Sequence, residues 1–557
     1  MSSKPANTIT GRSPFLALMR GEGVTTMFGN PGTTELPIMH ALTEQKDIGY
    51  VLGLQEAIVI AMADGFARAS GQLVACNVHV APGLGNAIGA IYTANLSGTA
   101  MIVTAGQQEQ GHGLTEPLLY APLVPIATPV VKWATEVNRI EDLPRILHRA
   151  AKIAQTAPTG PVFISLPGDI LNSEAALDLG EPTHVETRAR PSDAVLEVLA
   201  RRLLAAKNPM IMAGSELVSS DALAEAARLA EILGAPVFQQ SVQHGAHFPS
   251  EHPAFMGALS RSQPQVRQIL APHDLIVSLG AEVLTMSVYN PVDPLPPDTK
   301  LVQIGLRDWE MGKNWPADMA VRADLKETLL VLNPLLEKIG GPERAATARA
   351  ALAALAPRNW SAQRVAKRQA AAAKAGQTPI APEWLMMRLA ETLPRNAIIV
   401  DEGLTSATAL LSFYPFRDRH SYFGNVSGGI GWGIAAAVGI QKAQPTRRVV
   451  AVIGDGSAMY SVQALWSAAH YKLPVTYIIC NNGGYRILKQ RLKSFHGNDK
   501  PIGMDFRDPP IDMTGLATSL GVRAERVTTG AQFDAALKAS LAGAAPSVIE
   551  VMVEGKV

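Results

Sequence analysis

The chain has 557 residues, of which 47% are hydrophobic and 17% are charged, and its formal net charge is +1. This length indicates two to four domains, and the balanced charge and sparse aromatic residues argue against a surface for nucleic acid or anionic membrane. The N-terminus lacks the apolar stretch of a signal peptide, no apolar run approaches a membrane span, and Cys76 and Cys480 lie in apolar runs typical of buried thiols. We therefore expect a cytoplasmic protein.

Short apolar runs alternate with helical stretches, and they fall into three blocks. The first, about residues 10–185, holds the strand candidates Thr25–Phe28, Tyr50–Gly53, Leu73–Val78, Ala100–Thr104 and Val162–Leu166. The second, about 190–340, holds Pro209–Met212, Ala235–Gln239, Leu275–Leu279 and Leu301–Ile304. The third, about 380–557, holds Ala397–Val400, Val449–Ile453, Val475–Cys480 and Ser547–Val551. Such alternation predicts an α/β protein with three doubly wound parallel sheets.

Polar residues follow several strands of the first block. The turn Gly29–Pro37 contains Thr33 and Thr34 and can be interpreted as a helix start with a capping-box glutamate. Glu56 opens a helix, either as a surface residue that complements the helix dipole or as a buried carboxyl that shares a proton with a base. His79 ends a strand, where a histidine either transfers protons or holds a loop through a hydrogen bond.

An Ala-, Arg- and Lys-rich stretch, Arg344 to Lys374, lies between the second and third blocks. Its composition favours a helix with exposed charge. Two interpretations are open, a linker helix between domains and a basic contact surface for a partner or an anionic ligand.

The third block contains the most informative segment. Gly454-Asp455-Gly456-Ser457 follows one strand, and Asn481-Asn482 follows the next. A right-handed crossover brings both strand ends to one edge of the sheet, so Asp455 and Asn482 should meet there. Their oxygens suit Mg²⁺ or Ca²⁺. Ser457, as N-cap of a helix from about Ser457 to Tyr471, would add N–H groups that suit phosphate. Taken alone, Gly-Asp-Gly is also an ordinary turn sequence.

The Gly-Asp-Gly and Asn-Asn pair resembles the signature of the thiamine-diphosphate (ThDP) enzymes of the decarboxylase and acetolactate-synthase superfamily, and the Gly29–Pro37 turn resembles the benzoylformate decarboxylases within it. The resemblance implies a pyrimidine-binding domain over 1–185, a central domain over 190–340, a linker over 341–379 and a diphosphate-binding domain over 380–557. It implies a homodimer or homotetramer with active sites at the subunit interface, where Glu56 of one chain serves ThDP held by another.

The resemblance also implies a role for each motif residue. Glu56 would hydrogen-bond the aminopyrimidine ring of ThDP, and His79 would transfer protons to and from the substrate. Thr33 would contact the substrate carboxylate. The metal, Mg²⁺ or Ca²⁺, would be bound by Asp455, Asn482 and the Gly484 carbonyl. The remaining cofactor contacts would come from Gly403, Leu404, Thr405, Gly429, Ile430, Gly454, Gly456, Ser457 and Tyr485. Ile430 would hold the cofactor bent, although core packing is an alternative role for it.

The substrate pocket is where the chain departs from the benzoylformate decarboxylases. The pocket candidates are Thr34, Leu118, Leu119, Ser287, Arg486 and Ile487. Ser287 stands where those enzymes have a second active-site histidine, and a hydroxyl is a poor proton shuttle at neutral pH. The run Arg486 to Lys493 carries four cations, which either serve an acidic or phosphate-bearing substrate or form the solvated face of a helix.

We therefore expect a ThDP- and Mg²⁺-dependent carbon–carbon lyase that decarboxylates a 2-keto acid to an aldehyde. The alternatives are an acetolactate-synthase-like carboligase and an enzyme of the 2-hydroxyacyl-CoA lyase or oxalyl-CoA decarboxylase type. A bound FAD is not expected.

Overall fold

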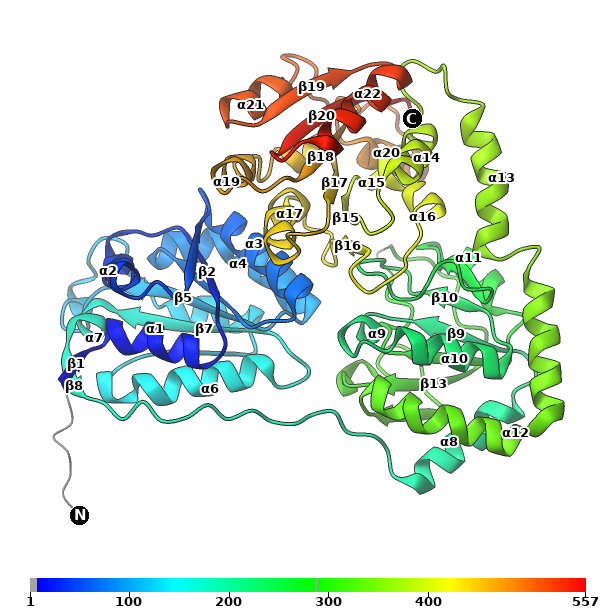
Figure 1. Ribbon diagram of the computed structural model, residues 1–557, viewed down its shortest axis with the longest axis horizontal. Coiled ribbons are helices and arrows are strands. Elements are labelled where there is room, and N and C mark those ends of the chain that lie inside the picture. Colours follow the sequence, from blue (N-terminus) through cyan, green and yellow to red (C-terminus); the bar gives the residue numbers. More distant parts are fainter. Residues whose placement is uncertain (1–7, 287) are drawn as a thin grey trace. The chain divides into compact units, whose positions relative to one another are not determined.

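The structure of the protein is a computed structural model, and it describes residues 8–286 and 288–557. The described residues form two compact units (Figure 1). The first comprises the chain up to residue 185 together with 400–405 and 425–557, and the second comprises 186–399 and 406–424. The chain therefore enters the first unit three times.

The first domain, blue to cyan in Figure 1, is built on a six-stranded parallel sheet. Its order is β3 (Gly49–Leu52), β2 (Thr26–Gly29), β4 (Val74–Val78), β5 (Met101–Gln107), β7 (Pro161–Pro167) and β6 (Trp133–Glu136). A short antiparallel pair joins β1 (Thr8–Thr10) to β8 (Glu174–Ala176). The helices are α1 (Arg12–Gly21), α2 (Leu36–Glu44), α3 (Glu56–Ser70), α4 (Val80–Ser97), α5 (Leu123–Ala127), α6 (Leu143–Gln155) and α7 (Gly168–Asn172).

Helices cover both faces of this sheet. Apolar side chains of α1 and α6, such as Phe15 and Leu147, pack with the strand residues Met27, Ile102 and Ile164 into one core. Helices α3 and α4 contact the sheet through β2, β4 and β5. All five residues of β4 are buried, because a strand covered on both faces needs a continuous apolar run rather than an alternating one.

The second unit contains the middle sheet, green in Figure 1, in which neighbouring strands all run parallel. Its order is β11 (Phe255–Ala258), β10 (Val237–Gln239), β9 (Pro209–Ala213), β12 (Leu275–Leu279), β13 (Lys300–Gly305) and β14 (Met319–Arg322). The helices are α8 (Asp193–Ala205), α9 (Glu216–Ser219), α10 (Leu223–Leu233), α11 (Gln263–Leu270), α12 (Leu325–Leu355) and α13 (Trp360–Ala372). The Arg344–Lys374 stretch is thus largely helical, and α12 is kinked at Gly341, which has a φ of +63°.

The third sheet has the order β16 (Tyr422–Gly424), β15 (Ile398–Glu402), β17 (Val449–Gly454), β18 (Thr476–Asn481), β20 (Ser547–Met552) and β19 (Arg523–Val527). The helices are α14 (Pro382–Thr392), α15 (Leu404–Ala407), α16 (Leu410–Phe413), α17 (Trp432–Ala443), α18 (Asp455–Ala458), α19 (Ala464–His470), α20 (Arg486–His496), α21 (Met513–Ser519) and α22 (Gly530–Ala542). The predicted fold class, three doubly wound parallel sheets, is confirmed.

Within the first unit, α3 and α17 pack closely against each other. A Cβ atom on Gly439 of α17 would overlap the Met62 carbonyl of α3, and one on Gly65 of α3 would overlap the Ala436 carbonyl of α17. Trp432, the first residue of α17, donates its Nε1–H to Asp64 Oδ2 at 2.6 Å. These contacts fix the start of α17 against the helix that Glu56 opens.

Cys76 and Cys480 are free and buried, as expected from their apolar surroundings. Among the described residues, no helix has the length and apolar character required to cross a membrane.

Candidate active site

Three strand ends of the third sheet converge on one cavity. The strands are β15, β17 and β18, which are neighbours in the sheet. The cavity is lined by Gly403, Leu404, Thr405, Gly454, Asp455, Gly456, Ser457, Asn482, Gly484, Tyr485, Arg486 and Ile487. The structure therefore brings together most of the residues to which the sequence assigned cofactor contacts, along with two of the substrate-pocket candidates.

Asp455 is the buried acidic residue of this cavity. Its Oδ1 accepts a hydrogen bond from Gly456 N at 2.9 Å, and its Oδ2 accepts from Gly483 N at 2.8 Å and from Gly484 N at 3.1 Å. Burial raises the pKa of the Asp455 carboxyl, because desolvation disfavours its charged form and outweighs these hydrogen bonds. A cation bound at this carboxylate would offset that cost.

The two adjacent asparagines serve different purposes. Asn481 donates through Nδ2 to Glu550 Oε1 at 2.7 Å and accepts from Gly483 N at 2.9 Å, so its side chain is committed to the fold. Asn482 lines the cavity. In the described chain, no group of three or more His, Cys, Asp and Glu residues could hold a metal. A metal bound here would therefore need amide and carbonyl oxygens in addition to Asp455, and the cavity supplies them.

The predicted role of Ser457 as a helix N-cap is wrong. Asp455 opens α18, with Gly454 in the N-cap position, and the predicted long helix is divided into α18 and α19. Ser457 instead lies at the cavity wall with a buried hydroxyl that has no hydrogen-bond partner in the described chain. Buried hydroxyls nearly always have a partner, so this oxygen fits a polar ligand that completes the site.

Glu402, at the end of β15, directly precedes the predicted cofactor contacts Gly403 to Thr405, and its contact with α17 was not predicted. It is buried and accepts hydrogen bonds from the N–H groups of Gly431 and Gly433. Burial raises its pKa to about 8. Because a Cβ atom on Gly433 would lie 2.9 Å from Glu402 Oε2, glycine is needed for this approach. Glu402 thus anchors the start of α17.

Gly429 and Ile430 immediately precede this anchored helix, and they are outside the residues that line the cavity. Asn425 Nδ2 donates to the Gly429 carbonyl, and Ser461 Oγ donates to the Gly431 carbonyl at 2.6 Å. The loop that carries Ile430 is therefore held on both sides.

Glu56 is buried at the first position of α3. Gln55 caps the helix by accepting from Ala57 N at 2.7 Å, and Asn86 of α4 donates to Glu56 Oε2 at 3.1 Å. Gly83 of α4 lies against the carboxylate, where a Cβ atom would be 2.9 Å from Oε1. Of the two interpretations of Glu56, the buried carboxyl matches the structure.

His79 lies at the end of β4 and contacts a second carboxylate that the sequence analysis treated only as part of a helix cap. His79 Nδ1 is 2.8 Å from Glu35 Oε2, and the hydroxyl of Thr34 is 3.3 Å from the same nitrogen. Thr33, the predicted substrate contact, is exposed, so the hydroxyl that reaches His79 is that of Thr34. A contact between residues 44 positions apart leaves no pattern that local spacing could reveal.

Leu118 and Leu119 are not among the residues that line the Asp455 cavity. Leu118 is 86% exposed, Leu119 is half-buried with a φ of +72°, and Ser287 lies outside the described residues. Glu56 and His79 are not among the residues that line the Asp455 cavity.

The cations of α20 mostly hold the chain itself. Arg486 donates to the Lys556 carbonyl, Lys489 pairs with Asp505 at 2.5 Å, and Lys493 donates to the Val557 carbonyl at 3.3 Å. Arg491 is the cation of the predicted run without such a partner among the described residues. These contacts weaken the substrate-binding interpretation, and the predicted solvated face is only partly matched, because Arg486, Lys489 and Arg491 are half-buried.

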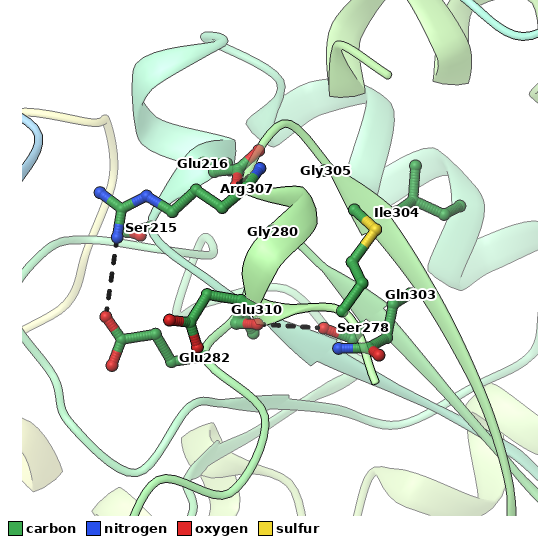
Figure 2. A pocket seen from close by; sticks show the side chains of 12 residues that line it. Ser215, Glu216, Ser278, Gly280, Glu282, Gln303, Ile304, Gly305, Arg307 and Glu310 are labelled. Carbon is green, nitrogen blue, oxygen red and sulfur yellow. Dashed lines mark hydrogen bonds and ion pairs between the residues drawn. The ribbon is translucent and has the colours of Figure 1, made fainter. Parts of the chain in front are cut away.

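A second cavity lies at the carboxyl ends of β9, β12 and β13 in the middle domain (Figure 2). Glu282 pairs with Arg307 across it at 3.7 Å. Glu216 accepts from Leu306 N at 2.6 Å and from Arg307 N at 3.3 Å. The Glu216 carboxylate thus accepts hydrogen bonds from peptide N–H groups that could otherwise bind an anion at this strand end.

Three family models match the chain in order. All three describe thiamine pyrophosphate (TPP) enzymes. The N-terminal TPP binding domain matches residues 9–117, the central domain matches 196–332, and the C-terminal TPP binding domain matches 403–551.

Individual relatives match over nearly the full length. Benzoylformate decarboxylase of Pseudomonas aeruginosa is 35% identical, over 97% of this chain and 98% of that protein. A probable acetolactate synthase large subunit of Methanocaldococcus jannaschii is 26% identical, over 98% and 92%. The structure of a thiamine diphosphate-dependent 4-hydroxybenzoylformate decarboxylase of Rhodococcus jostii RHA1 superimposes with a TM-score of 0.87 and 32% identity, over 98% of this chain and 100% of that chain.

Proposed function

The chain belongs to the thiamine pyrophosphate (ThDP) enzyme family, and we propose that it is a ThDP- and Mg²⁺-dependent lyase that decarboxylates a 2-keto acid of the benzoylformate class to an aldehyde. The observation that carries the proposal is the Asp455 cavity, which unites one buried carboxylate, Asn482 and the Ser457 hydroxyl, for which the described residues offer no hydrogen-bond partner. The similarity to two decarboxylases of aromatic 2-keto acids supports the substrate class.

The donor set of the cavity fits this cofactor. Asp455, Asn482 and the Gly484 carbonyl would bind Mg²⁺, which prefers oxygen ligands. Ser457, Tyr485 and the glycine backbone around them would hold the diphosphate. When bound, ThDP supplies a nucleophilic carbon for the keto group and a sink for the electrons that departing CO₂ leaves behind.

Residues of the first domain would hold and transfer protons. Glu56, buried and fixed by Asn86, would hold a proton against the pyrimidine ring of the cofactor. His79 would give a proton to, or take one from, the substrate oxygen. The burial of Glu56 and the restricted exposure of His79 keep bulk water away from these proton positions.

We propose that the active enzyme is a homodimer or homotetramer with its sites at the subunit interface, and that its domains are 1–185, 190–340 and 380–557 with a linker over 341–379. Large apolar side chains of the first domain are exposed in the single chain, among them Leu36, Leu54, Tyr92 and Leu114. On α4, no heavy atom of residues 8–286 and 288–557 lies within 4 Å of the position that a Cβ would take on Gly85 or Gly89, so this helix face has room for another chain. A second copy would cover these residues near Glu56.

The second candidate is carboligation, in which the same bound acyl group reacts with another carbonyl compound. The similarity to an acetolactate synthase subunit favours it, at lower identity. The third candidate, cleavage of an acyl-CoA, loses the support of the α20 cations, because Arg486, Lys489 and Lys493 are used within the chain.

An assay with ThDP and Mg²⁺ against benzoylformate, pyruvate, branched 2-keto acids and acyl-CoAs, with products identified, tests the proposal. We expect an aldehyde from benzoylformate. An acyloin or acetohydroxy acid as the main product would favour carboligation, and no turnover of any 2-keto acid would refute the proposal.

Glu56→Gln tests the role of the carboxylate. Because an amide cannot exchange the proton that the pyrimidine ring needs, turnover should fall by at least about 10²-fold. Binding of ThDP, followed by tryptophan fluorescence, should stay measurable because the Asp455 cavity is untouched. Full activity in this variant would exclude the role assigned to Glu56.

A further inference from the structure

The first domain contains two pairs of a histidine and a buried glutamate, and the two differ in one respect. His148 Nδ1 lies 2.5 Å from Glu22 Oε1, and its Nε2 lies 2.8 Å from the Leu179 carbonyl, so both ring nitrogens are used by the fold. His79 Nδ1 lies 2.8 Å from Glu35 Oε2, but no hydrogen bond in the described chain reaches its Nε2. Both ring nitrogens of His148 are thus hydrogen-bonded, whereas His79 has one nitrogen, Nε2, that remains available to exchange protons.

Glu35 is more completely bonded than a helix cap requires. A capping glutamate needs only the N–H of the N-cap residue, and Gly32 N supplies this bond at 2.8 Å. Glu35 also accepts from Gly106 N on β5 and from the Thr34 hydroxyl, each at 2.8 Å, and it is fully buried. Together with His79, these donors satisfy both carboxylate oxygens.

The backbone around the pair is shaped to bring it together. A Cβ atom on Gly32 would overlap the His79 ring, and one on Gly106 would overlap the Glu35 carboxylate. Val80, directly after His79, has a φ of +44°. Positive φ is costly for a β-branched residue, and strain of this kind persists where the surrounding structure enforces it. The contact between Glu35 and His79 is therefore built by three separate backbone features.

We propose that Glu35 is a positioning residue that holds His79 in the Nδ1–H tautomer and so makes Nε2 the atom that exchanges protons with the substrate. The carboxylate accepts the Nδ1–H bond throughout. When Nε2 carries a proton and donates it, the N–H bond breaks, an O–H bond forms on the substrate oxygen, and the electron pair stays on Nε2. The substrate step rests on the proposed function, whereas the tautomer does not.

Among the described residues, one other titratable side chain faces Glu35, and it does not compete with His79 for protons. Tyr50 of β3 donates its hydroxyl to Asn77 at 3.1 Å. Burial, and then the charge of Glu35, raise the pKa of Tyr50, so this hydroxyl stays neutral across the working range of the enzyme. A change in the pH profile on altering Glu35 would therefore report on His79.

The test compares Glu35→Gln with the matched control Glu22→Gln. In the cofactor-free protein labelled with ¹⁵N-histidine, the His79 signals, assigned with His79→Ala, should show that the neutral ring carries its proton on Nδ1 and leaves Nε2 bare. Glu35→Gln should shift them toward the other tautomer, because the Gln amide N–H can donate to Nδ1. Glu22→Gln should leave them unchanged. An unchanged His79 tautomer in Glu35→Gln, or protonated Nε2 in the unaltered protein, would overturn the proposal.

Activity supplies the second measurement. In Glu35→Gln, kcat should fall by about 10² to 10⁴-fold, as expected for a general base in the wrong tautomer, with ThDP binding changed less than about threefold. The pH profile of kcat/KM should differ between Glu35→Gln and the unaltered protein, whereas Glu22→Gln should keep the original profile. Glu22→Gln should lower Tm and keep kcat within about twofold. A kcat in Glu35→Gln equal to that of the control would also overturn the proposal.

A further variant separates the possible failures. If Glu35→Gln does not fold, Glu35→Asp keeps the charge and should retain the His79 tautomer with an intermediate kcat. If it instead loses the tautomer despite folding, the proposal fails. If the tautomer depends on Glu35 but the protein decarboxylates no 2-keto acid, the proposed function fails and the positioning role stands.

Discussion

At the scale of single residues, the neighbours Asn481 and Asn482 show that two identical residues of one motif can have different roles. Asn481 binds Glu550, a fully buried carboxylate that also pairs with Arg526 at 2.8 Å. Asn482 lines the cavity instead. The same residue type thus has a structural role at one position and a proposed metal-binding role at the next.

This division gives the first residue-scale prediction. Asn482→Ala should weaken Mg²⁺ and ThDP binding by at least about tenfold with little change in Tm, because it removes a metal ligand without opening the core. Asn481→Ala should cost about 1–3 kcal/mol of stability, because it removes a hydrogen bond from the buried Glu550. Calorimetric titration and thermal unfolding distinguish the two variants, and equal effects on both quantities would contradict the assignment.

Asp455 gives a prediction about pH. Its pKa is raised by burial, so a proton competes with the metal at a higher pH than for an ordinary aspartate. The affinity for Mg²⁺ and ThDP should therefore decline as the pH falls, beginning above the usual range of aspartate titration. Calorimetric titration at several pH values measures this, and Asp455→Asn should bind weakly at every pH.

The residue scale also shows what the sequence could and could not reveal. Asp455 and Asn482 were predictable, because the spacing of two strand ends places them at one sheet edge. Glu35 and Glu402 were not, because their partners lie far along the chain, at His79 and Gly106 for the first and at Gly431 and Gly433 for the second. Only the tertiary fold brings these groups into contact.

At the scale of elements, burial explains which strands could be predicted. Central strands such as β4, β12 and β18 are buried throughout and appear as continuous apolar runs. Edge strands are less uniform: β14 and β19 mix exposed, half-buried and buried positions, whereas the three-residue β16 is buried but too short to stand out as an apolar run. The strands of the three large sheets that the sequence analysis missed, β6, β11, β14, β16 and β19, are all edge strands. Ser457 was misplaced because α18 begins two residues earlier than the pattern suggested.

The anchor of α17 on Glu402 gives an element-scale prediction about stability and pH. The folded carboxyl, with a pKa of about 8, binds a proton more tightly than the unfolded one, whose ordinary value is 4.5. Its stabilising contribution is therefore present below about pH 4.5 and is lost as the pH rises through 8, by at most about 1.4 kcal/mol per pH unit.

Glu402→Gln tests this, because glutamine does not titrate. The free energy of unfolding of the cofactor-free protein should fall less steeply in this variant than in the unaltered protein between pH 5 and 8. Denaturant titrations at four pH values measure the slope. Glu525→Gln, at an exposed position of β19, should retain the original slope. Identical slopes for all three proteins would show that Glu402 titrates normally.

At the scale of the whole molecule, the open face of α4 predicts how the protein assembles. Gly85 and Gly89 lie one turn apart with no heavy atom near the position that a Cβ would take, and Tyr92 is exposed further along the helix. Gly89→Leu should shift the protein toward smaller species in sedimentation velocity, because a side chain there would block close approach of a second copy. Gly21→Leu, at the exposed end of α1, should assemble normally. Unchanged assembly of Gly89→Leu would place the interface elsewhere.

The packing of α3 on α17 also has a consequence for how the protein is made. The hydrogen bond between Asp64 and Trp432 joins residues 368 positions apart. At the usual rate of translation, roughly 20 to 70 s separate the synthesis of these two residues. Throughout this interval the face of α3 that carries Gly65 lacks its partner α17, while residues 186–399 emerge as one continuous stretch of the second unit. The nascent chain is therefore most exposed to misassembly along α3, until α17 leaves the ribosome.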